Sequence, residues 1–280
     1  MQLELIRLSL LERAQLDAFE PRTKNGSRLT REQFLREMFS QEIEFIHRKK
    51  RFYYVPDRDF EDLESPIVVG RLGRQLQVKE NEPPDAGLQE TSRPAWHAVW
   101  VLLDPRAHDD GQKLAVRHEY KMGRPVSIVS SLVEHINRST PEGPYVIESN
   151  AISDASDFWN FAKAHHGDIT SLRFIFIAPN MFGIDDDYEK ELRAMRDKER
   201  VRKAKLELEN PGGLSVETER VARAVEYVSR GGGSVKARTR TRQRFDSERK
   251  VKSVSVPEAE TPGISPIDLI KAAVRRIFPS

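Results

Sequence analysis

A stretch of alternating basic residues constrains the chain most, because every second residue from Lys236 to Arg244 is Lys or Arg. Side chains alternate between the two faces of a β-strand, so this pattern predicts a strand with one basic face. Like charges in such a row repel one another, and solvent or an anionic partner must screen them. The basic residues of the row are Lys236, Arg238, Arg240, Arg242 and Arg244.

A phosphate backbone fits this row. Same-face residues of a strand repeat at about 6.6 Å, which is roughly two nucleotides of duplex rise, and the planar guanidinium group suits phosphate. Three more basic residues follow, Arg249, Lys250 and Lys252, and we expect residues 251–256 to return antiparallel to the basic strand. The resulting hairpin is predicted to bind duplex DNA without sequence preference.

Two other interpretations of the basic hairpin stay open. It can be a solvated edge strand whose charge prevents aggregation, or a face that binds an acidic protein. The overall charge does not decide between them, since Lys and Arg number 46 while Asp and Glu number 44. The basic character is therefore local to this part of the chain.

Composition narrows the class of protein. A chain of 280 residues can form two domains with cores of their own. The absence of cysteine excludes disulfides, thiolate nucleophiles and cysteine-ligated metals. No apolar run approaches the ~18 residues of a membrane span, and the first residues lack the basic and hydrophobic parts of a signal peptide. We therefore expect a cytoplasmic protein.

An N-terminal α+β domain is predicted over residues 1–140. Its expected helices begin at the capping box of Thr30 and Gln33 and at Pro125, the second running to Ile136. Residues 79–93 are polar and proline-rich, which is typical of a loop or lid. The expected strands are Leu3–Leu11, Ile43–His47, Phe52–Val55, Ile67–Val69, Trp96–Leu103 and Lys113–His118.

A second α+β domain, with the basic hairpin, is predicted over residues 141–257. The continuous apolar run Phe174–Ile177 favours a central strand that is covered on both faces. The fold class is thus α+β, with two mixed domains, antiparallel hairpins and a C-terminal helix on a linker. The expected elements are strands Tyr145–Glu148, Leu172–Ile177 and Ala204–Glu209, and helices Asp154–His165, Asp186–Lys203 and Glu217–Ser229.

The last segment, 258–280, is predicted to be a linker followed by a helix that starts at Ser265-Pro266. A short helix is stable only when its apolar stripe is buried, either on its own domain or on the same helix of a second copy. We expect the second arrangement, a homodimer. The stripe consists of Ile267, Ile270, Val274 and Ile277.

Acidic residues raise the alternative of a magnesium-dependent nuclease. Two-metal chemistry needs carboxylates that converge from different elements, and the candidates are Glu148 and the run Asp185–Asp187. Acids in the first turn of a helix are equally well explained by its dipole. Adjacent groups such as His108, Asp109 and Asp110 seldom converge on one ion. No catalytic residue, metal or cofactor is therefore predicted.

The order of elements resembles that of the RexA-like phage exclusion proteins. The similar segments are the hairpin from Phe45 to Val55, the run Tyr145–Ser149 that includes Glu148, and the run Gly167–Pro179. This resemblance implies a cytoplasmic, dimeric protein that binds DNA without sequence preference, senses phage infection and acts through a membrane ion-channel partner. The alternative in the same setting is a magnesium-dependent nuclease of a phage-defence system.

Overall fold

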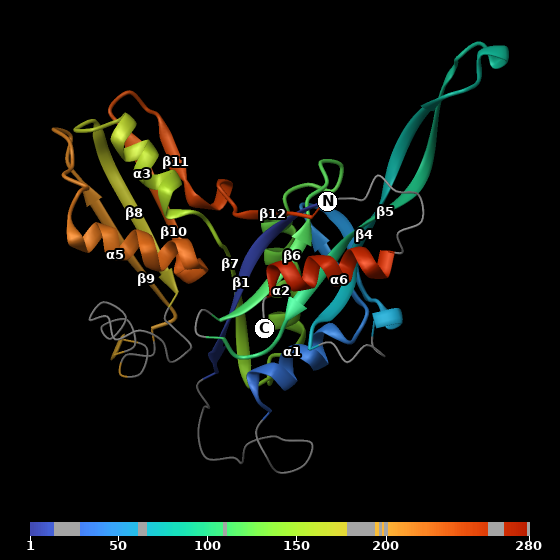
Figure 1. Cartoon of the computed structure of the whole chain (residues 1–280), viewed down its shortest axis with the longest axis horizontal. Coiled ribbons are helices and arrows are strands. Elements are labelled where there is room, and N and C mark those ends of the chain that lie inside the picture. Colours follow the sequence, from blue (N-terminus) through green and yellow to red (C-terminus); the bar gives the residue numbers. More distant parts are fainter. Residues whose placement is uncertain are drawn as a thin grey trace.

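The computed structural model describes residues 1–13, 29–60, 66–108, 111–177, 194–195, 198, 201–256 and 266–278. These residues form two antiparallel sheets with helices packed on them, which confirms the α+β class (Figure 1). Within this part of the chain, no helix is both long enough and apolar enough to cross a membrane.

The larger sheet contains eight strands in the order β12-β1-β6-β5-β4-β3-β2, with β7 paired to β1. Alternation of side chains places even-numbered β1 residues such as Ile6 and Leu8 on one face, and Leu3 and Leu5 on the other. The strands are β1 (Gln2–Glu12), β2 (Ile43–His47), β3 (Lys50–Pro56), β4 (Val68–Asn81), β5 (Glu90–Asp104), β6 (Gln112–Arg117), β7 (Tyr145–Ala151) and β12 (Ser253–Ser255).

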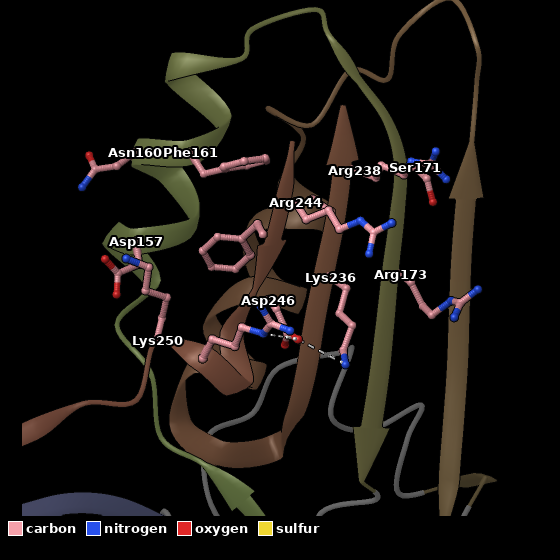
Figure 2. A pocket seen from close by; sticks show the side chains of 13 residues that line it. Asp157, Asn160, Phe161, Ser171, Arg173, Lys236, Arg238, Arg244, Asp246 and Lys250 are labelled. Atoms are coloured by element: carbon pink, nitrogen blue, oxygen red, sulfur yellow. Dashed lines mark ion pairs between the residues drawn. The ribbon is translucent and has the colours of Figure 1, made fainter. Parts of the chain in front are cut away.

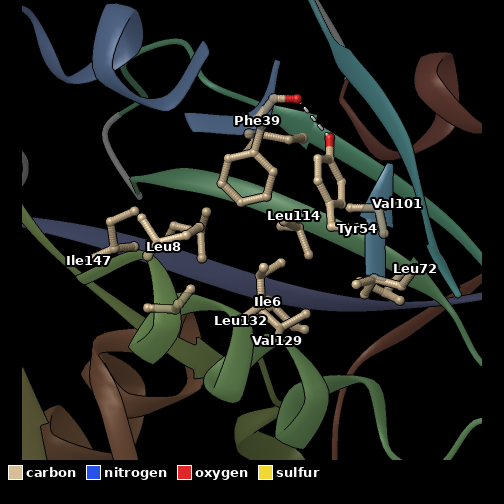
Figure 3. Close-up of a cluster of buried hydrophobic side chains, with 14 of the residues drawn as sticks. Ile6, Leu8, Phe39, Tyr54, Leu72, Val101, Leu114, Val129, Leu132 and Ile147 are labelled. Carbon is tan, nitrogen blue, oxygen red and sulfur yellow. Dashed lines mark hydrogen bonds between the residues drawn. The ribbon is translucent and has the colours of Figure 1, made fainter. Parts of the chain in front are cut away.

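Helices cover both faces of the larger sheet. Helices α1 (Arg31–Phe39) and α2 (Pro125–Ser139) pack on the face that carries Ile6 and Leu8 (Figure 3). The predicted capping box of α1 is present: the Gln33 amide donates to Thr30 Oγ1 at 3.2 Å, and the Thr30 amide donates to Gln33 Oε1 at 2.9 Å.

The opposite face is covered by α6 (Pro266–Ile277), and this corrects the predicted dimer stripe. Ile270 and Ile277 are buried in a cluster with residues of β1 and β5, and Ile267 and Val274 are partly buried against the same cluster. The stripe is therefore covered by its own chain and needs no second copy. The sheet residues of this cluster include Leu3, Leu5, Val69, Leu102 and Ala115.

The smaller sheet has four strands in the order β11-β10-β8-β9. One sequence of elements occurs twice along the chain: a helix, then a central strand, then an edge strand. The first set is α3 (Ala155–Ala164), β8 (Ile169–Ile177) and β9 (Lys203–Glu209), and the second is α5 (Glu219–Tyr227), β10 (Gly233–Thr239) and β11 (Arg244–Asp246). Both helices pack on the same face of the sheet, in one core.

The sheets divide the chain differently from the predicted boundaries at 140 and 257. Strand β7 joins the larger sheet beside β1, and β12 returns to its edge. The chain crosses between the sheets at Ser153 and again at Val251, and these two residues form a β-bridge. The short single-turn elements are η1 (Arg58–Phe60), η2 (Pro84–Ala86), η3 (Val228–Gly232) and η4 (Ser247–Arg249).

Two further predictions were wrong. The segment 79–93 is the end of a β-ribbon rather than a loop or lid, because β4 and β5 stay paired as far as Asn81 and Glu90. Strand β8 is covered on one face only, since Phe174 is buried while its neighbour Arg173 is exposed. The acids Asp185–Asp187 lie outside the described residues.

Candidate nucleic-acid interface

The basic row turns back on itself instead of forming one strand. Strand β10 ends at Thr239, and the chain returns as β11 from Arg244. The Thr239 hydroxyl accepts a hydrogen bond from the Gln243 amide at 2.9 Å, and Arg242 has a φ of 69°. The alternation of basic residues continues unbroken through this tight turn, so the sequence does not reveal it. The prediction that all five basic residues share one strand face was therefore wrong.

The turn nevertheless brings basic residues together across the hairpin. Arg238 lies directly opposite Arg244, and Lys236 lies opposite Asp246. Paired residues share a face of the sheet, so Lys236, Arg238 and Arg244 project from the same side (Figure 2). The predicted return of residues 251–256 along the basic strand was wrong, because the hairpin is formed by β10 and β11, whereas residues 253–255 pair with β1.

Strand β8 adds residues that the sequence interpretation missed. Arg173 is the partner of Lys236, and Ser171 is the partner of Arg238. Leu172, Phe174 and Arg173 follow the alternation of a strand with one buried and one open face. Giving more weight to that period-two signal would have identified Arg173 as an open-face residue.

The opposite sides of the same strands fix this arrangement. Val235 and Ala237 are buried in the core beneath the sheet, and so is Phe245 of β11. The ring of Phe245 packs against the rings of Phe158 and Phe161 on α3, each at a centroid distance of 5.6 Å. The apolar contacts therefore hold β11 in register, and Arg244 projects from this packed support.

Lys236 is neutralised by acids on the same hairpin. Its Nζ lies 2.9 Å from Glu248 Oε2 and 3.4 Å from Asp246 Oδ2. Burial on its own would lower the pKa of Lys236, but the hydrogen bond and charge of Glu248, together with Asp246, outweigh burial and raise this pKa. Arg173 is likewise paired, with Nε 3.0 Å from Glu207 Oε1 on β9.

Arg238 and Arg244 differ from these paired cations. Both side chains are exposed, and neither forms an ion pair with any residue in the described part of the chain. Like charges directly opposite each other in a sheet are destabilising. Nearby, Arg249 is only loosely paired, with Nε 3.8 Å from Asp246 Oδ2, and Lys250 is exposed.

These side chains line one groove of about 670 Å³ that extends from the open face of the smaller sheet to α3, which packs on the covered face. Asp157, Asn160 and Phe161 of α3 form its other wall (Figure 2). Of the eight residues predicted to bind nucleic acid, five line the groove: Lys236, Arg238, Arg244, Arg249 and Lys250.

The other three predicted residues lie outside the groove. Arg240 is in the turn, where its Nε is 3.8 Å from Asp168 Oδ1 and its Nη2 donates to the Gly212 carbonyl at 3.2 Å. Arg242 follows in the same turn. Lys252 lies in the segment that returns to the larger sheet, and its amide donates to the Ile152 carbonyl at 2.7 Å.

Of the candidate nuclease residues, only Glu148 lies within the described part of the chain. Glu148 Oε2 forms an ion pair of 2.9 Å with Lys203 Nζ. His108 Nε2 lies 2.8 Å from Oδ2 of the fully buried Asp104, which also binds Arg106. Across the described ranges, no three His, Cys, Asp or Glu side chains cluster closely enough to hold a metal ion.

Comparison with known proteins identifies no relative of this chain. No family model, no curated protein and no solved structure matches this chain. The resemblance to the RexA-like phage exclusion proteins stays a prediction.

Proposed function

We propose that this protein binds the backbone of duplex DNA, without sequence preference, through the open face of its smaller sheet. The observation that carries the proposal is the opposed pair Arg238 and Arg244, exposed and without an ion pair in the described residues. Two facing arginines repel each other in the free protein. A bound phosphate would convert that repulsion into two charge-assisted contacts.

Phosphate is a better partner for this face than an acidic protein. The planar donors of arginine match phosphate geometry, and the paired strands repeat their side chains at about 6.6 Å, close to two nucleotides of duplex rise. Arg249 and Lys250 extend the basic surface along the groove. Lys236 contributes less, because Glu248 and Asp246 already neutralise it.

A duplex is favoured over a single strand by the chemistry of the open face. Single strands are held largely by stacking of bases on exposed aromatic side chains. The described open-face positions of β8 and β10 hold Ser, Arg, Ile and Lys instead, and Phe245 is buried. Contacts to phosphate carry no sequence information directly, so binding should depend little on base sequence.

The cellular role remains a separate prediction. Phage exclusion and a membrane ion-channel partner rest on the family resemblance alone. The DNA-binding proposal stands on the geometry of the hairpin and does not require that resemblance.

Fluorescence anisotropy with a labelled duplex tests the proposal. The double variant R238A/R244A should bind at least on the order of a hundredfold more weakly, since each charge-assisted contact contributes about 1.5 kcal/mol or more. The matched control R275A/R276A removes two exposed arginines from α6 and should bind as the parent does.

Competition distinguishes the alternatives. Unlabelled duplex of unrelated sequence should compete as well as the labelled sequence, and the corresponding single strand should compete more weakly. Polyglutamate that displaces the duplex at lower charge concentration than DNA would favour the acidic-protein alternative. Equal binding by R238A/R244A and the parent would overturn the proposal.

A further inference from the structure

A two-stranded ribbon projects from the body of the larger sheet. Past the pair Gln75 and Trp96, strands β4 and β5 continue alone to Asn81 and Glu90, and the ribbon stands clear of the rest of the molecule (Figure 1). This extension is about 20 Å long at the rise of an antiparallel strand. An isolated hairpin is at best marginally stable in water, so a ribbon of this length favours a partner that covers it.

The tip of the ribbon is acidic. Lys79 pairs with Glu90 at 2.6 Å, and Arg93 pairs with Glu80 at 2.9 Å. Within each pair, the two opposite charges cancel. Glu82 and Asp85 remain, without an ion pair among the described residues. A basic partner would complement this tip, whereas a phosphate backbone would be repelled by it.

A basic turn lies beside the base of the ribbon. Strand β3 pairs with β4 as far as Tyr53 and Gly73, which places the β2–β3 turn next to the start of the extension. Its central residues, Arg48 and Lys49, have φ values of 48° and 65°. Such turns favour Asn-Gly, because other residues rarely adopt positive φ. Basic residues at a strained turn point to a functional role for their charge.

Exposed apolar residues lie between the turn and the ribbon. Trp96 is 63% exposed, and its ring packs against the ring of Tyr53, with centroids 5.4 Å apart. The strand pairing places Ile46 and Val55, both exposed, on the same face of the sheet. Tryptophan and tyrosine are enriched among residues that dominate protein interfaces.

We propose that two copies of this chain associate through the β4–β5 ribbon, related by a two-fold axis. The ribbons lie antiparallel, so the acidic tip of each copy reaches the basic β2–β3 turn of the other, and Trp96 and Tyr53 pack between them. A two-fold interface requires that one surface carries both complementary halves. Here one surface carries the acidic tip of the ribbon and, beside the base of the ribbon, the basic β2–β3 turn.

Charge reversal tests this arrangement in the absence of DNA. The parent chain should sediment as a dimer, whereas the tip variant E82K/D85K and the turn variant R48E/K49E should each dimerise on the order of a hundredfold more weakly, because like charges then face each other. An equimolar mixture of the two variants should dimerise as the parent does. In that mixed pair, both tip-to-turn contacts again join opposite charges.

The control variant K271E/R275E makes the same change of charge on exposed residues of α6 and should leave the dimer intact. Circular dichroism of each variant verifies folding. A parent chain that is monomeric at its highest soluble concentration would overturn the proposal, as would a mixture that stays monomeric. Neither result bears on DNA binding, since no nucleic acid is present.

Discussion

The two sheets bury their faces to different extents. The larger sheet is covered on one side by α1 and α2 and on the other by α6, and its central strands are apolar on both sides. The smaller sheet has α3 and α5 on one side only, and its open side carries Arg173, Lys236, Arg238 and Arg244. A sheet face can thus stay uncovered when its residues are charged, and the arginines without an ion pair on that face are where we propose that DNA binds.

The largest expected difference between the two sheets is the effect of a substitution on the free energy of unfolding. Leu114 is fully buried in the larger sheet, so Leu114→Ala should lower the free energy of unfolding by about 3 kcal/mol. Arg238→Ala on the open face should change it by less than about 0.5 kcal/mol, or raise it slightly by removing the repulsion with Arg244. Urea denaturation followed by circular dichroism measures both variants. A large loss for Arg238→Ala would mean that this arginine has a structural role.

The salt dependence of DNA binding is the second prediction. If Arg238, Arg244, Arg249 and Lys250 each neutralise one phosphate, the slope of log K against log salt should be about −3.6 per protomer. Affinity should then fall about a hundredfold between about 50 and 200 mM salt, and only about tenfold for R238A/R244A. Parallel slopes for the parent and the variant would show that these two arginines do not contact phosphate.

The third prediction uses acid pH, which should affect the larger sheet first. Burial on its own would raise the pKa of Asp104, but hydrogen bonds from Arg106 and His108 outweigh burial and lower that pKa. Its contribution is therefore present above the unfolded pKa of about 3.9 and is lost as the pH falls through the lower, folded value. Asp104→Asn should cost about 2 kcal/mol at neutral pH and flatten the acid side of the stability curve.

Lys236 in the smaller sheet has the opposite dependence. Its folded pKa is raised, so its contribution is complete below the unfolded pKa of about 10.4 and is lost as the pH rises through the higher, folded value. Thermal unfolding curves at acid and alkaline pH, recorded for the parent and for Asp104→Asn, separate the two cases. An Asp104→Asn variant with unchanged acid sensitivity would contradict the assignment to Asp104.

Local signals predicted the elements, and pairing between distant segments was not predictable from them. The capping box at Thr30 and the helical spacing in 125–136 are contained in a few neighbouring residues, and both helices formed as expected. The partner of a strand is not encoded locally, which is why 145–151 was assigned to the second domain although it pairs with β1.

The candidate site shows the same limit. The basic alternation identified Lys236, Arg238 and Arg244 of the groove, but the turn at Arg242 interrupts the strand without changing the pattern. The ribbon tip was assigned to a loop because both of its faces meet solvent and it lacks an apolar alternation. The backbone pairing of β4 with β5 and cross-strand ion pairs such as Lys79 with Glu90 hold it in register.

The last prediction concerns the boundary between paired and unpaired charge within the groove. Glu248 holds Lys236 through an ion pair of 2.9 Å, so Glu248→Gln should release that lysine toward the open face and remove one negative charge beside it. Asp246 still pairs with Lys236 at 3.4 Å, which limits the gain. DNA affinity should therefore rise only a few-fold, as expected for the change of one partly exposed ion pair of up to about 1 kcal/mol. Because Lys236 then neutralises an additional phosphate in part, the salt slope should steepen by less than about 0.9.

Anisotropy titrations at several salt concentrations measure both quantities, and the matched variant Glu219→Gln removes a similar exposed acid on α5, away from the groove. Equal gains in the two variants would show that the effect comes from net charge alone, and that Lys236 takes no part in binding.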